Sequence, residues 1–402
     1  MLSGCGEQVS GRYGEGYELG SNGPGSPAKT GLGQKVAILL PLTGPRADVG
    51  KVLLQAAQLA LGNGAGPTLD VIDTGGTPAG AVTAIQTAIG NRDSVVLGPL
   101  TSSETAAVAP LAKTANLPVL AFTNDPSQAQ PGVWTLGITP GQQIRRLVVA
   151  ASAQGKAQFA ALLPSSDFGH AMANGLTRAL AAENLPPATV RMHGSGMGAL
   201  TSATREVSDY ADRRGPIEAR VKAARAEGTP EGRHEAQELM KSSVPPPPFN
   251  VLVLADTGEP LQEIASLLPY FDVDRYSVQI VGPALWADPS SGSGAVSGAW
   301  YAAPDNAARA GLERDYSAKY GAPPPPLADL AYDGASVAAA IISHSGAQLT
   351  VLTQPAGFVG TDGWLAFLPD GQVRRGLAVF RIERGGPALI DPAPQSSAAP
   401  GS

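Results

Sequence analysis

The feature that most restricts the fold is a regular alternation of short apolar runs and longer amphipathic segments. The runs KVAILLPL, LDVID, SVVLG, LPVLAF and VWTLG follow one another from residue 35 onward. Short continuous apolar runs are typical of strands buried on both faces, and the segments between them have helical spacing. Strands that alternate with helices predict a parallel sheet with helices on both faces.

A second series of the same kind begins after residue 150. Its predicted strands are QFAALLP, ATVRMHG, NVLVLAD and SVQIVG. A chain of 402 residues exceeds the size at which one hydrophobic core usually stops growing. We therefore expect an α/β protein with two Rossmann-like lobes joined by a hinge, and a cleft at the carboxyl ends of their strands.

The predicted domain boundaries lie where the alternation starts, stops and resumes. The first lobe is expected to cover residues 35–150 and to regain part of 300–345. The second is expected to cover residues 151–300 and to regain 346–388, which includes a Pro-Asp-Gly hairpin signal. Residues 199–248 are charged and poor in large apolar side chains. We interpret them as a solvated helical insertion, with a partner-binding surface as the less favoured alternative.

Both ends of the chain predict irregular structure. Residues 1–34 indicate a flexible linker and residues 389–402 a disordered tail. Cys5 is the only cysteine, which excludes an internal disulfide and a cysteine-based zinc site. Its context, LSGC, resembles the lipobox of bacterial lipoproteins, although no basic and apolar leader precedes it here. We expect a lipid anchor on Cys5, and Gly6 in place of aspartate favours the outer membrane by the same resemblance.

Composition and motifs argue against several classes of function. The net charge of −6 and the low aromatic content of 5% disfavour nucleic-acid binding. No apolar run is long enough for a transmembrane helix. The four histidines are scattered, and the sequence contains no HExxH, GxSxG or GxxxxGK motif. We therefore expect no enzyme activity, no metal and no cofactor.

The stretch VVLGPLTSSE ends a predicted strand and begins a predicted helix. Thr101 and Glu104 have the spacing of a capping box, in which each side chain satisfies a free backbone N–H group. The same N–H groups and the helix dipole also suit a carboxylate or phosphate of a ligand. Ser102 and Ser103 are therefore either part of a helix cap or part of an anion site.

Small polar loops follow the other predicted strands of both lobes. The carboxyl ends of parallel strands meet at one edge of a sheet, so these loops are expected to face the cleft. Phe168 and Trp286 are either apolar walls of that cleft or ordinary core aromatics. The candidate ligand-binding residues are Thr43, Ser102, Ser103, Thr123, Asp167, Phe168, Asp256 and Trp286.

The order of these motifs resembles the type I periplasmic-binding-protein fold of the leucine-binding family. VAILLPLTGPRADVG, VVLGPLTSSETAAVAP and LPSSDFGHAMANGL carry the resemblance, which extends over residues 35–385. Within that superfamily, VLVLADTGEPLQEIASLLPYFDV, VGPALWADP and GTDGWLAFLPDGQVRRGLAV look most like the penicillin-binding protein activators. These are lipoproteins of the outer membrane that stimulate a peptidoglycan synthase in the periplasm.

The resemblance implies two alternative functions. In the first, the chain is a non-catalytic periplasmic lipoprotein that shifts a peptidoglycan synthase, a penicillin-binding protein, toward its active conformation. In the second, it delivers an amino acid of the branched-chain type, or a similar small molecule, to the permease of an ABC transporter. By resemblance, Ser102 or Ser103 and Thr123 hold the ligand's carboxylate in the second case, and Asp256 takes its ammonium group. We favour the first function because of the LPYFDV and LW motifs.

Overall fold

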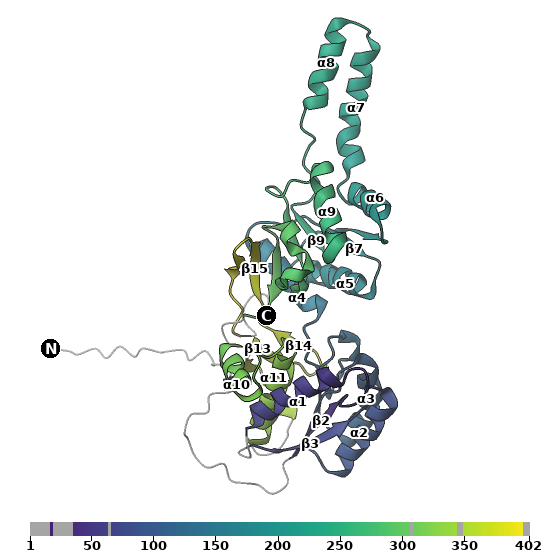
Figure 1. The fold of residues 1–402 in the computed structure, drawn as a ribbon. Coiled ribbons are helices and arrows are strands. Elements are labelled where there is room, and N and C mark those ends of the chain that lie inside the picture. The colour runs from purple at the N-terminus through teal and green to yellow at the C-terminus, as the bar shows by residue number, and fades with distance from the viewer. Residues whose placement is uncertain (1–16, 19–34, 63–65, 306–308, 344–348, 397–402) are drawn as a thin grey trace, which may run out of the picture. The chain divides into compact units, whose positions relative to one another are not determined.

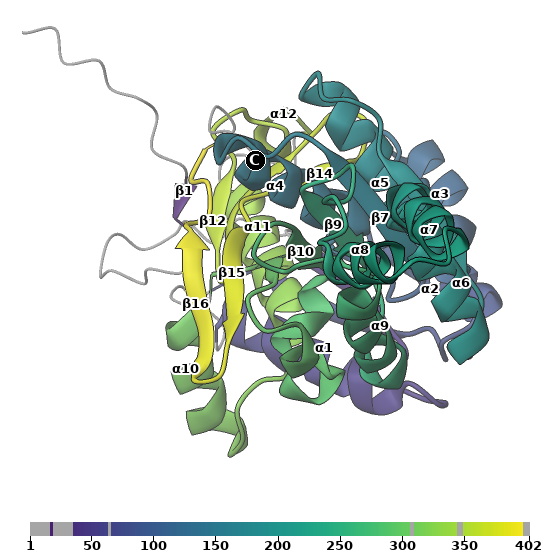
Figure 2. The same ribbon diagram turned by 90° about the horizontal axis from the view of Figure 1, so that it is seen from above.

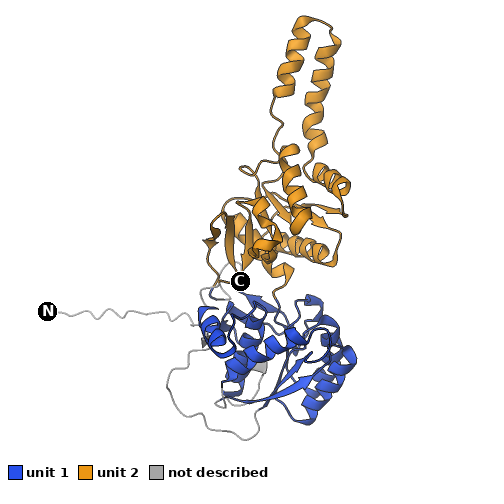
Figure 3. Ribbon diagram, viewed as in Figure 1, with its two compact units in different colours: residues 1–137, 306–375, 395–399 blue, residues 138–305, 376–394, 400–402 orange. Residues whose placement is uncertain are grey.

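The structure is a computed structural model that describes residues 17–18, 35–62, 66–305, 309–343 and 349–396. It consists of two compact units, coloured separately in Figure 3. Unit 1 comprises residues 1–137, 306–375 and 395–399, and unit 2 comprises residues 138–305, 376–394 and 400–402. Each unit is an α/β structure with parallel strands, which confirms the predicted fold class.

Unit 1 is built on a five-stranded parallel sheet in the order β3-β2-β4-β5-β6. Its strands are β2 (Lys35–Leu40), β3 (Thr68–Asp73), β4 (Val95–Leu97), β5 (Val119–Ala121) and β6 (Val133–Thr135). Ile38 in β2 pairs with Val71 on one side and with Leu97 on the other. Because both neighbours of β2 are strands and both its faces carry helices, nearly all its residues are buried.

Helices cover both faces of this sheet (Figure 1). They are α1 (Ala47–Leu61), α2 (Pro78–Gly90), α3 (Ser102–Ala115), α10 (Ala310–Tyr320) and α11 (Ala328–Ser343), with the short helices η1 (Pro126–Gln128) and α12 (Leu349–Leu352). Ile38 belongs to the core cluster that α1 and α11 form, whereas Leu39 belongs to the cluster that α2 and α3 form. Successive side chains of β2 thus enter opposite layers of the unit.

A small four-stranded sheet completes unit 1. Its order is β1 (Tyr17–Glu18), β12 (Phe358–Gly360), β13 (Gly363–Phe367) and β14 (Val373–Arg375). The strands β13 and β14 form the hairpin that Pro-Asp-Gly predicts. Residues 346–375 were expected in the second lobe, but Phe358 and Phe367 are buried in the core beside α11. Residues 17–18, expected in the linker, pair with β12, and Cys5 lies outside the described residues.

Unit 2 is built on a seven-stranded sheet in the order β16-β15-β11-β10-β9-β7-β8. The bounds are β7 (Phe159–Pro164), β8 (Thr189–His193), β9 (Val251–Leu254), β10 (Gln279–Gly282), β11 (Trp300–Ala303), β15 (Ala378–Glu383) and β16 (Gly386–Asp391). Strands β7 to β11 are parallel, and β15 and β16 add an antiparallel pair at one edge (Figure 2). Residues 389–391 were expected in the disordered tail, but they pair with β15.

The helices of unit 2 also form two layers. They are α4 (Pro140–Ala153), α5 (Asp167–Ala182), α6 (Met197–Val207) and α9 (Gly258–Tyr270), with the short turns η2 (Ala284–Ala287), η3 (Pro289–Ser291) and η4 (Ser293–Val296). The predicted first lobe ended at residue 150 and so included most of α4. That boundary is wrong, because Ile144, Leu147 and Ala151 of α4 pack in the core of unit 2 against Leu176 of α5.

The charged segment after α6 forms two antiparallel helices, α7 (Tyr210–Ala226) and α8 (Pro230–Lys241). They project from the α/β body of unit 2 as a helical hairpin (Figures 1 and 3). Val221, Ala224 and Ala236 form the small core between the two helices. These side chains bury little apolar area, so the hairpin depends on its base for a fixed position.

Candidate functional site

Thr43 lies in the loop after β2 and is bonded to the end of the neighbouring strand. Its hydroxyl donates to Asp73 Oδ2 over 2.7 Å, and the backbone N–H groups of Leu42 and Gly75 donate to Asp73 Oδ1 over 2.9 and 2.8 Å. Partial burial acts to raise the pKa of Asp73, but these hydrogen bonds outweigh it and the pKa lies below its usual value. Thr43 therefore orders the edge of the sheet.

The capping box predicted at the start of α3 is confirmed. Thr101 Oγ1 accepts the N–H of Glu104, and Glu104 Oε2 accepts the N–H of Thr101 over 3.1 Å. The Glu104 side chain is fully buried, and its Oε1 also accepts the hydroxyl of Thr74 over 2.6 Å. A carboxylate of the chain itself thus lies at the positive end of the helix dipole.

The structure brings Ser102 and Thr123 close to a second carboxylate, that of Asp125, whereas Ser103 contacts Thr101. The hydroxyl of Ser102 donates to Asp125 Oδ2 in a short hydrogen bond, and the backbone N–H of Asp125 donates to Thr123 Oγ1 over 3.1 Å. Ser103 Oγ lies 3.3 Å from Thr101 Oγ1. Burial acts to raise the pKa of Asp125. The hydrogen bonds from Ser102 and from the side chain and backbone of Ser127 outweigh burial and leave this pKa below its usual value.

These contacts define what the N-terminus of α3 can do chemically. Two carboxylates already accept donors there, Glu104 those of the Thr101 hydroxyl and backbone N–H, and Asp125 that of the Ser102 hydroxyl. An anionic ligand at the same place would approach like charges and would have to displace these bonds. Asp125 lies in the loop after β5, and nothing in the sequence indicates that it bonds to Ser102, 23 residues earlier.

In unit 2 the candidate residues Asp167 and Phe168 occupy the first turn of α5. Ser166 is the N-cap, and its hydroxyl oxygen accepts the N–H of Gly169 over 3.2 Å. Asp167 is exposed, and its negative charge interacts favourably with the helix dipole. Phe168 is half-buried and packs against the core of unit 2. This turn offers an aromatic edge and a free carboxylate oxygen at the carboxyl end of β7.

Asp256, at the carboxyl end of β9, pairs with a histidine that the sequence analysis did not select. His193 Nε2 lies 3.1 Å from Asp256 Oδ2, and His193 Nδ1 lies 3.0 Å from the carbonyl oxygen of Gly194. Both ring nitrogens face acceptors, which favours the charged imidazolium. Burial acts to lower the pKa of His193, but the bonds to Asp256 and Gly194 outweigh it and leave the pKa raised. His193 is the last residue of β8, which is its only signal in the sequence.

Trp286 is buried in the core of unit 2, with only 2% of its surface exposed. Its indole N–H donates to the backbone oxygen of Asp256 over 2.9 Å. The ring lies on Gly282, where a Cβ atom would come within 2.3 Å of it. Trp286 therefore fixes the backbone that carries Asp256, and of the two roles expected for it the structure supports the core role.

A third group of carboxylates lies in unit 1 and was not predicted. Asp333 of α11 is completely buried, and its Oδ1 accepts the N–H and hydroxyl of Thr361 over 2.7 and 2.8 Å. Arg375 Nη1 lies 3.5 Å from Asp362 Oδ2. Burial, together with the charge of Asp362, raises the pKa of Asp333 to about 6. Gly360 is required beside it, because a Cβ atom there would lie 2.3 Å from Asp333 Oδ2.

The described part of the chain contains no group of three or more histidine, cysteine, aspartate or glutamate side chains that could hold a metal ion. None of the described helices combines the length and the hydropathy that a membrane span requires.

Comparisons with known proteins identify the fold. The C-domain of LpoA from Haemophilus influenzae, a regulator of PBP1A, is 15% identical with a TM-score of 0.63; the match covers 89% of this chain and 100% of that one. A protein of a branched-chain amino acid ABC transporter from Rhodospirillum rubrum is 19% identical with a TM-score of 0.66, over 89% and 100% of the two chains. At these identities the likeness shows the fold alone.

Three further matches define how much of the chain is shared with known proteins. An uncharacterised protein of Rickettsia prowazekii is 24% identical over 179 residues, which are 44% of this chain and 48% of that protein. The match thus spans about half of this relative, and the match to full-length LpoA covers 59% of that chain. The family model of the periplasmic binding proteins matches residues 33–387, nearly the whole of both units. The chain therefore belongs to the periplasmic binding protein family and has its type I, leucine-binding fold.

Proposed function

We propose that this chain is a non-catalytic regulator that contacts a peptidoglycan synthase, a penicillin-binding protein, and favours its active conformation. The observation that carries the proposal is the occupation of the N-terminus of α3 by the chain's own carboxylates, Glu104 and Asp125. In the amino-acid-binding relatives implied by the sequence, this position holds the carboxylate of the ligand. A chain that fills it with its own side chains is poorly suited to carry an amino acid.

The second half of an amino-acid site is also engaged. A ligand's ammonium group needs an acidic residue with free oxygen atoms, and Asp256 is the candidate. Its Oδ2 faces His193 at 3.1 Å, and its side chain is 6% exposed. The imidazole of His193 thus takes the place expected for the ammonium group, and its bonds to Asp256 and Gly194 favour its charged form.

The similarity to LpoA supports the same proposal. The chain covers the whole of the LpoA C-domain, which is described as part of a regulator of PBP1A. A regulator without chemistry of its own acts by binding one conformation of its partner more tightly than another. We propose that contact with the synthase raises the population of the active conformation in this way.

The proposed function includes a place in the cell. Membership of the periplasmic binding protein family implies the periplasm or the cell envelope. We propose in addition that Cys5 is lipidated and that the lipid anchors the chain to the outer membrane. Mass spectrometry of the chain isolated from membranes tests this, since an unmodified Cys5 contradicts it.

The second candidate function is an amino-acid carrier for an ABC transporter permease. The observation that favours it is the match to the Rhodospirillum rubrum protein, which this chain covers completely at a TM-score of 0.66. Such a carrier requires ligand contacts at Ser102, Thr123 and Asp256 that replace the bonds to Asp125 and His193.

Two measurements on the purified chain separate the candidates. A regulator is expected to increase the rate at which a penicillin-binding protein polymerises its lipid-linked substrate, and to show no thermal shift with the free amino acids. A carrier is expected to be stabilised by one of them, by about 2.7 kcal/mol when the ligand is at about one hundred times its dissociation constant. A synthase rate that stays unchanged at saturating chain contradicts the proposed regulator.

A further inference from the structure

Unit 2 contains two adjoining hollows at the edge of the sheet opposite to His193 and Asp256. The larger has a volume of about 640 Å³ and the smaller about 380 Å³. Arg275, Ile280 and Ser297 line both, so the two hollows share a wall. We call them together the arginine groove. It lies near the start of β10, whereas His193 and Asp256 lie at or just beyond the ends of β8 and β9.

The larger hollow has an apolar floor. Leu268, Val273 and Val296 are buried there, with exposed fractions of 3 to 4%. Val244 and Pro246 add one wall, and they belong to the segment that returns from α8 to β9. The charged insertion therefore forms part of the wall of this hollow. Neither the small core between α7 and α8 nor the sheet of unit 2 requires this wall.

The smaller hollow is lined by three arginines, Arg275, Arg381 and Arg384. Arg381 Nε donates to Glu383 Oε1 over 2.8 Å, so one of these charges is compensated. The guanidinium group of Arg275 lies 5.3 Å from the ring centre of Tyr276. Within the described ranges of the chain, neither Arg275 nor Arg384 forms an ion pair. Two exposed positive charges thus remain beside an apolar hollow.

The groove is held in shape by a buried arginine at the base of the hairpin. Arg213 of α7 donates to the backbone oxygens of Pro245, Phe271 and Asp272 over 2.7, 3.2 and 2.8 Å. Pro245 lies between two wall residues of the larger hollow, and Asp272 is itself a wall residue. Fixed walls lower the entropic cost of binding, because less backbone has to be ordered when a ligand enters.

We propose that the arginine groove binds a linear segment of a partner protein, in which apolar residues are followed by acidic ones. Burial of the apolar side chains in the larger hollow gives affinity. The carboxylates face Arg275 and Arg384, and this charge complementarity fixes the direction of the segment. Asp272 and Asp274 line the larger hollow and disfavour the reverse direction.

The test selects ligands without assuming a partner. The immobilised full-length chain is exposed to a phage-displayed library of random linear peptides. We expect the enriched peptides to combine apolar with acidic residues. The double variant Arg275→Glu with Arg384→Glu is expected to weaken binding of the best peptide by about tenfold in a fluorescence polarisation assay, since two attractive charges become repulsive. High salt is expected to weaken the wild-type complex.

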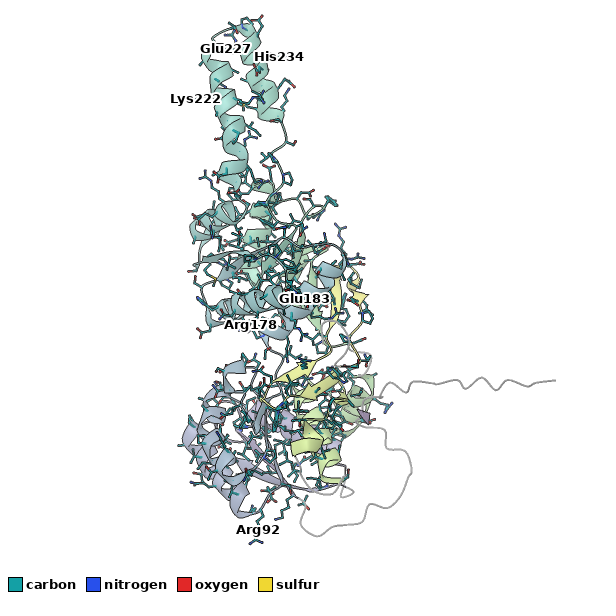
Figure 4. All side chains as sticks on the ribbon, turned by 180° about the vertical axis from the view of Figure 1, so that it is seen from behind. Arg92, Arg178, Glu183, Lys222, Glu227 and His234 are labelled. Carbon is teal, nitrogen blue, oxygen red and sulfur yellow. The ribbon has the colours of Figure 1, made fainter. Side chains whose placement is uncertain are left out.

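Two further variants make the result specific. Lys222→Glu removes a positive charge from the same unit, but Lys222 lies on the hairpin away from its base (Figure 4) and is expected to leave binding unchanged. Ser297→Trp places a large side chain at the wall shared by the two hollows and is expected to abolish peptide binding. The chain is expected to remain folded, with a thermal unfolding transition like that of the wild type. Three results would each overturn the proposal. The selection enriches no peptides, the enriched peptides contain no more acidic residues than the library, or the double variant binds the best peptide as tightly as the wild type. No synthase is present, so this test fails or succeeds independently of the proposed function.

Discussion

His193 is held between two opposing effects, since burial favours its neutral form while Asp256 and the carbonyl of Gly194 favour its charged form. The effects that favour the charged form outweigh burial, so the pKa of His193 is raised above 6.5. A histidine whose pKa is raised on folding stabilises the fold below its unfolded pKa and loses that contribution as the pH rises through the folded pKa. The pair is therefore a small source of stability that is present in mild acid.

Replacing the partner tests this account. In the variant Asp256→Asn the hydrogen bond to Nε2 loses its negative charge, so the pKa of His193 is expected to fall below the wild-type value. The titration of the imidazole signals by NMR measures it directly, with His193→Gln to assign the resonance. An unchanged midpoint would show that Asp256 does not carry the effect.

The buried carboxylates of unit 1 predict a pH dependence of the opposite kind to ordinary acid unfolding. Burial raises the pKa of Asp333 to about 6 and that of Asp362 to about 7, far above the unfolded value of about 3.9. The folded chain then binds more protons than the unfolded chain, so their contribution is complete below about pH 4 and is lost as the pH rises through about 6 and 7. Urea unfolding at a series of pH values measures this decline in the free energy of unfolding.

The control for this prediction uses two amides. Asp333→Asn keeps an oxygen atom for the donors of Thr361 but cannot ionise, so the decline above pH 5 to 6 is expected to become shallower. Asp48→Asn changes a fully exposed carboxylate on α1 and is expected to leave the profile unaltered. If both variants retain the wild-type decline, another group is responsible for it.

At the scale of elements, the hairpin of α7 and α8 depends on one buried side chain. Arg213 is 8% exposed and donates to four backbone oxygens, of which that of Ser208 lies 2.9 Å away. In Arg213→Met these oxygens lose a charged donor, and the loss is expected to cost on the order of 3 kcal/mol. Hydrogen exchange should become faster throughout both helices, because their own core is too small to replace the anchor.

The matched control is Arg220→Met on the same helix. Its guanidinium group lies 3.7 Å from Glu235, and both side chains are largely exposed. An exposed ion pair of this kind contributes about 0 to 1 kcal/mol, so exchange in the hairpin is expected to stay close to that of the wild type. Equal effects of the two variants would place the anchoring of the hairpin elsewhere than at Arg213.

At the scale of the whole molecule, each unit has its own core, and we expect each to unfold as a separate transition. Ile85→Ala in unit 1 and Leu176→Ala in unit 2 each remove a fully buried side chain, at a cost of about 2 to 5 kcal/mol. Each variant should lower only the melting temperature of its own unit. The tryptophans Trp134 and Trp300 report on units 1 and 2 separately when the others are replaced, and a joint shift in both signals contradicts the prediction.

Much of this fold could be predicted because the local sequence pattern identifies its strands. Every predicted strand from β2 to β10 is present, since short apolar runs bounded by turn residues are typical of strands. The membership of residues 306–375 in unit 1 could not be predicted in full. It follows from contacts such as that of Leu365 with the distant core around Leu97, and periodicity does not report contacts between remote segments.

The candidate site was predictable only where its chemistry is local. The capping box of Thr101 and Glu104 joins residues three positions apart, so its spacing was visible in the sequence. Asp256 and His193 are 63 positions apart, and a lone histidine at a strand end gives no indication of its partner. In the sequence, Asp333 resembles an ordinary polar residue of a helix, because nothing in LAYDG indicates that Thr361 donates hydrogen bonds to it.

The order in which the units are assembled from the chain has a consequence for biosynthesis. Unit 1 begins with β2 and α1 but receives α11 and β13, which cover the same core, only after all residues from 138 to 305 have followed. During synthesis, the apolar face of α1 therefore stays without its packing partner α11, which is translated late in the chain. Late completion of this core is expected to delay the folding of unit 1 until most of the chain has been made.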